Sequence, residues 1–175
     1  MKNVYDNSIF FNEYQEMRSN QINANNLIEI PIMKSFLPDL TNKTILDLGC
    51  GFGEHCKGFV ESGAKKVIGI DISEKMLEIA KQENADSKIT YINMPMENIF
   101  ELTEKFDIVI SSLAFHYVED FAGVVKNVYN LLNENGTFIF SQENPLCTCH
   151  SGGQRWTKDE NGNKLYLNLS NFLEH

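Results

Sequence analysis

The chain has 175 residues, of which 42% are hydrophobic, and a formal net charge of −9. This length and composition are those of one globular domain with a proper core. The charge disfavours a nucleic-acid partner, because no basic patch along the chain offsets it. No apolar run approaches the roughly 18 residues of a membrane-spanning helix.

The polar start of the chain is unlike a secretory signal, and four cysteines in a chain of this length do not suggest a disulfide scaffold. We therefore expect a cytoplasmic protein. The last residues, 173–175, resemble a cloning scar that runs into a histidine tag, so we expect the natural chain to be longer.

Residues 8–18 predict a helix, because apolar side chains recur at near-helical spacing. Tyr14 and Arg18 lie four positions apart and therefore share one face of that helix. The apolar segment 27–37 is interrupted by Pro31, which predicts either two short helices or one bent helix.

The most informative stretch of the chain joins a strand, a glycine turn and a helix. The apolar run 44–48 predicts a buried parallel strand. Gly49, Gly51 and Gly53 follow on alternate positions, and 54–62 predicts a helix. This order opens a nucleotide-binding site in α/β folds.

Two common nucleotide sites do not fit this turn. Glu54 stands where a dinucleotide-binding fingerprint has its last glycine, and its carboxylate would repel a pyrophosphate. A phosphate-binding loop is excluded because no Gly-Lys-Ser/Thr follows the glycines.

The pattern Asp47-x-Gly49-x-Gly51-x-Gly53 resembles the first motif of class I S-adenosylmethionine-dependent methyltransferases of the small-molecule type. In that family the acid before the glycines interacts with the amino group of the ligand, often through water. The resemblance implies that S-adenosylmethionine is the cofactor and S-adenosylhomocysteine the product.

The segment 67–71 predicts the second strand and places Asp71 at its carboxyl end. A carboxylate at this point is able to accept both hydroxyls of a ribose. Dinucleotide enzymes share this spacing, so it indicates a ribose without selecting the cofactor. Ser73 is well placed to cap the next predicted helix, 74–83, and we expect Ile72 to pack on the adenine.

The third strand is predicted over 89–93, and the turn that follows resembles the family's adenine-contacting turn. Met96 and Glu97 match two positions of that turn. Pro95 stands where many members carry an aspartate, so Glu97 or a backbone carbonyl would have to bind the adenine amino group.

The run 106–112 predicts the fourth strand, and 113–118 after it resembles the family's fourth motif, which carries a Leu-x-x-His stretch. Ligands of open α/β sheets bind beyond the strand ends at this crossing point. In all, the resemblance and the residue types predict fifteen cofactor-binding residues: Tyr14, Arg18, Asp47, Gly49, Cys50, Gly51, Gly53, Asp71, Ile72, Met76, Met96, Glu97, Ser111, Ser112 and Leu113.

His116 is the predicted catalytic residue, because the resemblance places it near the transferred methyl group and imidazole is a suitable base. The alternative is a histidine held by structural hydrogen bonds. Tyr117, Glu143 and His150 are weaker candidates, predicted on the substrate side.

An amphipathic helix is predicted over 121–132, a fifth strand over 137–141, and a hairpin from 154–157 and 164–169 about Asn161-Gly162. Alternating strands and helices imply right-handed crossovers. We therefore predict an α/β, Rossmann-like, doubly wound and mostly parallel sheet with N-terminal capping helices and a C-terminal hairpin.

The predicted division of the chain has four parts: an N-terminal helical cap at 1–43, an S-adenosylmethionine-binding core at 44–145, a substrate-side loop and hairpin at 146–172, and the scar at 173–175. Full family domains end with two more strands that this chain does not show. An exposed edge on the fifth strand predicts a homodimer, through that edge or an exchanged hairpin.

The cluster Cys147, Cys149 and His150 lacks a second ligand pair, so we predict no metal site. Segment 111–114 lacks the Asn/Asp-Pro-Pro-aromatic tetrad of amino-base DNA methyltransferases, which favours a small-molecule acceptor. Two alternatives to a methyltransferase stay open: a non-catalytic cofactor-binding module and, as the weakest, a nicotinamide-dependent oxidoreductase.

Overall fold

The computed structural model describes Phe11 and residues 25–144 and 156–168. The chain forms two compact units, residues 1–141 and residues 142–175. The described elements of the first unit are η2 (Asn25–Glu29), α2 (Ile30–Phe36), β1 (Thr44–Leu48), α3 (Glu54–Glu61), β2 (Lys66–Asp71), α4 (Glu74–Glu83), β3 (Ile89–Asn93), η3 (Met96–Glu101), β4 (Phe106–Ser111), η4 (Phe115–Tyr117), α5 (Phe121–Leu131) and β5 (Leu132–Phe140).

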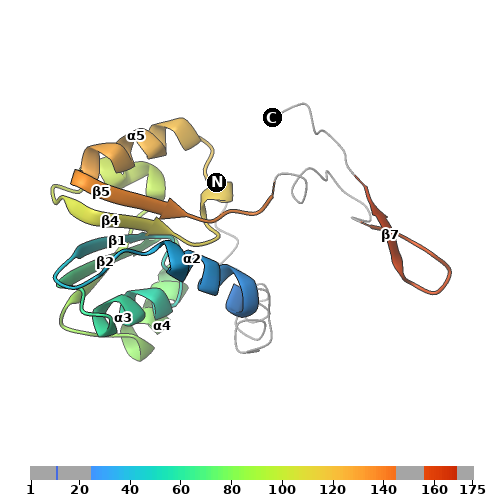
Figure 1. Ribbon diagram of the computed structural model, residues 1–175, viewed down its shortest axis with the longest axis horizontal. Coiled ribbons are helices and arrows are strands. Elements are labelled where there is room, and N and C mark those ends of the chain that lie inside the picture. The colour runs from blue at the N-terminus through green and yellow to red at the C-terminus, as the bar shows by residue number, and fades with distance from the viewer. Residues whose placement is uncertain (1–10, 12–24, 145–155, 169–175) are drawn as a thin grey trace. The chain divides into compact units, whose positions relative to one another are not determined.

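The five strands of this unit form one parallel sheet in the order β3-β2-β1-β4-β5 (Figure 1). The chain winds outward from β1 through β2 to β3, and then returns to the other side of β1 as β4. The carboxyl ends of β1 and β4 are therefore neighbours at the point where the winding reverses, which is where open α/β sheets bind their ligands. The predicted Rossmann-like, doubly wound sheet is confirmed.

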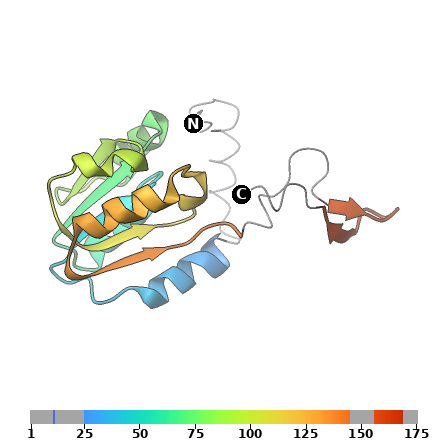
Figure 2. The ribbon, with the colours of Figure 1, turned by 90° about the horizontal axis from the view of Figure 1, so that it is seen from above.

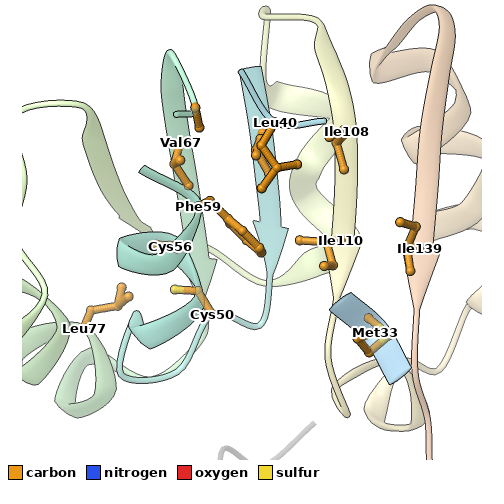
Figure 3. Packing of buried hydrophobic residues seen from close by; sticks show 12 residues of the cluster. Met33, Leu40, Cys50, Cys56, Phe59, Val67, Leu77, Ile108, Ile110 and Ile139 are labelled. Carbon is orange, nitrogen blue, oxygen red and sulfur yellow. The ribbon is translucent and has the colours of Figure 1, made fainter. Parts of the chain in front are cut away.

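Helices cover both faces of the sheet, because strand residues alternate between two buried clusters. On one face Met33 of α2, Phe59 of α3 and Leu77 of α4 share a cluster with strand residues such as Ile108 (Figure 3). The opposite face carries α5, η3 and η4, which Figures 1 and 2 show on the far side from α3 and α4. The sheet is thus covered on both faces, and its carboxyl edge lies between the two layers.

The N-terminal part of the described chain is continuous. The π-helix η2 passes directly into α2, and Pro31 lies just after the junction, so this segment is one helical stretch that changes type beside the proline. Of the helix predicted over 8–18, the structure describes Phe11, which is helical, buried and edge-on to the ring of Phe52 at 6.0 Å. Tyr14, Arg18 and His150 lie outside the described residues.

The fifth strand begins earlier than predicted. Phe106 pairs with Leu132, whereas Ile108, two positions later, pairs with Thr137. The extra residues of β5 form a bulge within the strand, so the prediction that the fifth strand begins at 137 was wrong. Residues 133–136 are typical of turns, but the pairing of β5 with β4 already begins at Leu132.

The second unit contains the predicted antiparallel hairpin, formed by β6 (Trp156–Lys158) and β7 (Lys164–Leu167). The Asp159 carboxylate accepts hydrogen bonds from the N–H groups of Asn161 and Asn163, at 2.9 and 2.8 Å. Gly162 takes the left-handed backbone that this turn needs, with φ of 83°. In the described part of the chain, none of the helices has the length and apolar character needed to cross a membrane.

Candidate cofactor site

The glycine turn leaves β1 and folds back over β2. The N–H groups of Gly49 and Cys50 both donate to the carbonyl oxygen of Ile70, each at 2.9 Å. Gly49, Gly51 and Gly53 have left-handed φ values of 75°, 53° and 78°. Only glycine adopts this backbone routinely, so the alternating pattern reflects a tight turn between β1 and α3.

The surroundings of the three glycines differ. A Cβ on Gly49 would lie 2.5 Å from the Cβ of Ala114, and one on Gly53 would lie 2.2 Å from the hydroxyl of Tyr91. Among the described residues, a Cβ on Gly51 would meet nothing within 4 Å. Gly51 therefore borders open space, where a ligand is able to approach the main chain.

Asp71, at the carboxyl end of β2, is tied to the glycine turn. Its Oδ2 accepts a hydrogen bond from the N–H of Gly51 at 2.9 Å, and its Oδ1 accepts one from the N–H of Ser73 at 2.8 Å. The hydroxyl of Ser73 accepts from the N–H of Met76 and caps α4, as predicted. Capping is thus the role of Ser73, and the Asp71 carboxylate is fixed beside the turn.

Asp47 lies beneath the turn and is 1% exposed. Its Oδ2 accepts a hydrogen bond from the thiol of Cys56 at 3.3 Å, and burial raises the pKa of the carboxyl group. A hydrogen bond with Cys50 and burial raise the pKa of the Cys56 thiol well above its usual range. Both sulfurs pack where a Cβ on Gly69 would stand, at 2.8 and 2.9 Å from it, so the cysteines fill the space under the turn.

The residues after β4 join three elements. The hydroxyl of Ser111 donates to the carbonyl oxygen of Leu48 at 2.8 Å and links the ends of β4 and β1. The N–H of Leu113, whose φ is 50°, donates to both the carbonyl and the hydroxyl of Ser141. The hydroxyl of Ser112 donates to Glu29 at 2.8 Å.

The remaining described candidates of the first unit lie around this edge. Met96 packs against the turn, with its Cε 3.1 Å from the Cβ position of Gly49, and Glu97 follows in the first turn of η3. Ile72 is 41% exposed next to Asp71, as suits a surface for a flat ring. The side chain of Met76 is 3% exposed and belongs to the core.

His116 and Tyr117 lie on η4, the short helix after β4. Their rings are 4.2 Å apart, with the histidine half-buried and the tyrosine exposed. Glu143 is exposed and belongs to the second unit. The structure thus brings His116 to the same strand end as Ser111, Ser112 and Leu113.

The sequence reasoning missed the residues that support the turn from behind. The hydroxyl of Tyr91 donates to the carbonyl oxygen of Asn84 at 2.9 Å. The side-chain amide of Asn84 in turn donates to the carbonyl oxygen of Phe52 at 2.9 Å. The hydroxyl of a partly buried tyrosine usually finds a hydrogen-bond partner, so a tyrosine in the predicted strand 89–93 was the available signal. Asn84 carried no such signal, and neither did Glu29. Across the described residues, no group of three or more histidine, cysteine or acidic side chains is arranged to hold a metal ion.

Comparison with known proteins shows the family to which this chain belongs. The model of a methyltransferase domain family matches residues 39–171. The chain belongs to this family. Its sheet and flanking helices are those of the class I S-adenosylmethionine-dependent methyltransferases, and S-adenosylmethionine is the cofactor of these enzymes.

Two solved structures are similar to this methyltransferase domain over most of its length. A Listeria monocytogenes protein assigned to the S-adenosylmethionine-dependent methyltransferases is 44% identical with a TM-score of 0.76, covering 83% of this chain and 68% of that one. An S-adenosylmethionine-dependent methyltransferase from Mesorhizobium loti is 35% identical with a TM-score of 0.74, covering 87% and 67%.

Relatives known by sequence are similar over different shares of the domain. An uncharacterised protein of Haemophilus influenzae is 44% identical over 177 residues, 98% of this chain and 70% of that protein. A ubiquinone biosynthesis O-methyltransferase of Neisseria meningitidis is 32% identical over 118 residues, 64% of this chain and 50% of that enzyme. The chain therefore spans between 50% and 70% of the length of these two proteins.

The residues at the edge fit S-adenosylmethionine. This ligand carries no phosphate, and the turn begins α3 with the acid Glu54 rather than with a phosphate-binding lysine. The space over Gly51 lies beside the Asp71 carboxylate, so a ribose and the main chain of the turn are able to meet there.

Proposed function

We propose that this methyltransferase domain binds S-adenosylmethionine along the carboxyl edge of the sheet and transfers its methyl group to a small-molecule acceptor by in-line displacement. The observation that carries the proposal is the glycine turn. Its central residue, Gly51, faces open space while its N–H group holds the Asp71 carboxylate at 2.9 Å.

Each part of the edge has a proposed role in holding the cofactor. Asp71 accepts the ribose hydroxyls, and Ile72 and Met96 enclose the adenine together with Glu97. The main chain from Gly49 to Gly53, with Asp47 below it, receives the methionyl part, and Ser111 to Leu113 border it from β4. Tyr14 and Arg18 are proposed to complete this set, with the guanidinium on the methionyl carboxylate.

The bound cofactor supplies a methyl group on a positively charged sulfur. The task of the protein is to align the acceptor with that methyl group and to exclude water. The lone pair of the acceptor attacks the methyl carbon as the carbon–sulfur bond breaks. We propose that His116 takes the proton that the acceptor hydroxyl or amine loses in this step. Tyr117 is proposed to contact the acceptor, and for Glu143 and His150 such a contact stays a prediction from the sequence.

A small-molecule acceptor is favoured over a nucleic acid by the net charge of −9. The name of the Neisseria meningitidis relative points the same way. Glu54 at the start of α3 opposes the nicotinamide alternative, because its carboxylate would face a pyrophosphate. A cytoplasmic location and a homodimer belong to the same proposal.

The proposal is tested by following tritium from the labelled methyl group of S-adenosylmethionine. The protein is incubated separately with a metabolite extract below about 3 kDa, with total RNA and DNA, and with protein. Label should enter a low-mass product that chromatography separates from S-adenosylmethionine, and Asp71→Ala should abolish this product, whereas Asp39→Ala, on an exposed turn, should not. Label that enters only a macromolecule would contradict the proposed acceptor class, and S-adenosylhomocysteine binding without any transfer would favour the non-catalytic module.

A further inference from the structure

Glu29, the last residue of η2, directs its carboxylate at the ends of β4 and β5. Its Oε1 accepts hydrogen bonds from the hydroxyl of Ser112, at 2.8 Å, and from the hydroxyl of Ser141. Ser112 follows β4 and Ser141 follows β5. One carboxylate oxygen therefore joins the ends of two neighbouring strands at the edge where the cofactor is proposed to bind.

The second oxygen of Glu29 is different. Oε2 is buried, and no described residue gives it a hydrogen bond. A buried oxygen without a partner costs about 1–3 kcal/mol, so an oxygen of this kind calls for an explanation. Because an ionised carboxylate only accepts hydrogen bonds, a partner for Oε2 from outside the described residues must be a donor.

The sheet order places Glu29 on the acceptor side of the site. Asp71 ends β2, the glycine turn follows β1, and Glu29 binds the ends of β4 and β5. In the order β2-β1-β4-β5, Asp71 and Glu29 thus lie on opposite sides of the turn. A cofactor whose ribose is at Asp71 and whose methionyl part reaches Ser111 to Leu113 leaves the β5 side of this edge to the second substrate. The proposed base His116 follows β4 on the same side of the turn.

We propose that Glu29 is an acceptor-binding residue and that its Oε2 receives an N–H or O–H donor of the methyl acceptor. The inference rests on the proposed function and names the substrate class of that site, an amine, alcohol or phenol. A molecule that presents a carboxylate or phosphate at this point is disfavoured, because like charges in close contact cost several kcal/mol.

The experiment compares acceptors of matched carbon skeleton in a tritium-transfer assay with S-adenosylmethionine. Benzylamine and other amines, benzyl alcohol and phenols, and benzoate and other carboxylates form the three sets. Label should enter either the amine set or the hydroxyl set. The set that is labelled shows whether the donor to Oε2 is an N–H or an O–H group. Glu29→Gln should lower kcat/KM for that set by about 100-fold, as expected when one partner of a charged hydrogen bond is lost.

Three controls separate binding of the acceptor from a role in structure. Glu61→Gln removes an exposed carboxylate of α3 and should change nothing. Asp39→Ala removes an exposed carboxylate of a turn outside the site and should also keep full activity. The dissociation constant for S-adenosylhomocysteine and the Tm of Glu29→Gln should stay near those of the unaltered protein.

Several results would overturn the assignment. They are transfer to carboxylates only, full activity of Glu29→Gln, and no transfer to any amine or hydroxyl compound by a protein that binds S-adenosylhomocysteine. Failure of the unaltered protein to bind S-adenosylhomocysteine would instead contradict the proposed function itself, and this assignment with it.

Discussion

At the scale of single residues, Gly51 is where backbone and ligand requirements meet. Alanine at φ of 53° is strained, so we expect Gly51→Ala to lower the free energy of unfolding by about 1 kcal/mol. Its methyl group would enter the open space over the turn. We therefore expect the dissociation constant for S-adenosylhomocysteine, measured by calorimetry, to rise roughly tenfold or more, which corresponds to about 1.4 kcal/mol.

Gly58 offers the matched control for this substitution. It lies inside α3, and a Cβ there would also meet no described atom within 4 Å, but its φ is not left-handed. Gly58→Ala should raise the free energy of unfolding by roughly 0.5–1 kcal/mol and leave ligand affinity unchanged. Equal effects of the two substitutions on affinity would refute the assignment of the space over Gly51 to the ligand.

The negative charge of Asp47 lowers the stability of the fold, because the carboxyl group is buried. Burial raises the pKa of its carboxyl group from 3.8, so ionisation costs stability as the pH rises above the unfolded-state value. We predict that Asp47→Asn raises the free energy of unfolding by roughly 0.5–2 kcal/mol at pH 7.5, while it weakens binding of S-adenosylmethionine.

Urea unfolding at several pH values checks this prediction. The gain should shrink as the pH falls toward 4, because Asp47 is then increasingly protonated in the unfolded chain as well. A variant that is less stable than the unaltered protein at pH 7.5 would show that the Asp47 carboxylate stabilises the fold, against this account.

At the scale of secondary structure elements, Asp107 links the amino ends of three strands. Its carboxylate accepts hydrogen bonds from the N–H and hydroxyl of Thr44 and from the side chain of Asn133. The backbone hydrogen bond from Thr44 is the main cause that lowers the pKa of Asp107. We expect Asp107→Ala to lower the free energy of unfolding by about 1–2 kcal/mol at neutral pH.

The pH dependence has the opposite sign to that of Asp47. A lowered pKa means that the stabilisation by Asp107 is present above the ordinary aspartate pKa and is lost as the pH falls through the lower, folded-state value. Denaturant unfolding of Asp107→Ala and of the unaltered protein should therefore converge below about pH 4. A difference that stays constant with pH would mean that packing, rather than charge, is responsible.

The same scale shows what local pattern predicts and what it cannot. The strands from β1 to β4 and the helices between them follow from short apolar runs and turn residues, because each is specified within its own ten residues. The bulge of β5 is not specified by its own residues, because it depends on which residue of β4 pairs with each residue of β5. The contacts of Glu29 are even harder to predict from local pattern, because its partner Ser141 is 112 positions away in the chain.

At the scale of the whole molecule, two exposed features adjoin each other. Among the described strands β5 pairs only with β4, which leaves one edge open. Helix α2, which contacts β5, exposes Ile32 by 51% and Phe36 by 66%, next to Ile28 of η2 at 60%. Exposed strand edges and apolar patches favour association, so we predict a homodimer through this face.

Light scattering after gel filtration tests the homodimer. We expect a mass of twice the 20.0 kDa of one chain at about 50 µM, since isologous pairs are the commonest assemblies. Ile32→Ser with Phe36→Ser should yield the single-chain mass. Tyr129→Ser, on α5 and 78% exposed, should not. A single-chain mass for the unaltered protein would contradict the prediction.

The central claim, that the edge formed by the glycine turn and Asp71 binds S-adenosylmethionine, is tested most directly by calorimetric titration. S-adenosylhomocysteine and NADH are titrated in turn into the unaltered protein, Asp71→Ala and Asp39→Ala. The account predicts that S-adenosylhomocysteine binds to the first and third proteins, that Asp71→Ala loses this binding, and that NADH binds to none. Binding of NADH alone, or S-adenosylhomocysteine binding that is unchanged by Asp71→Ala, would contradict it.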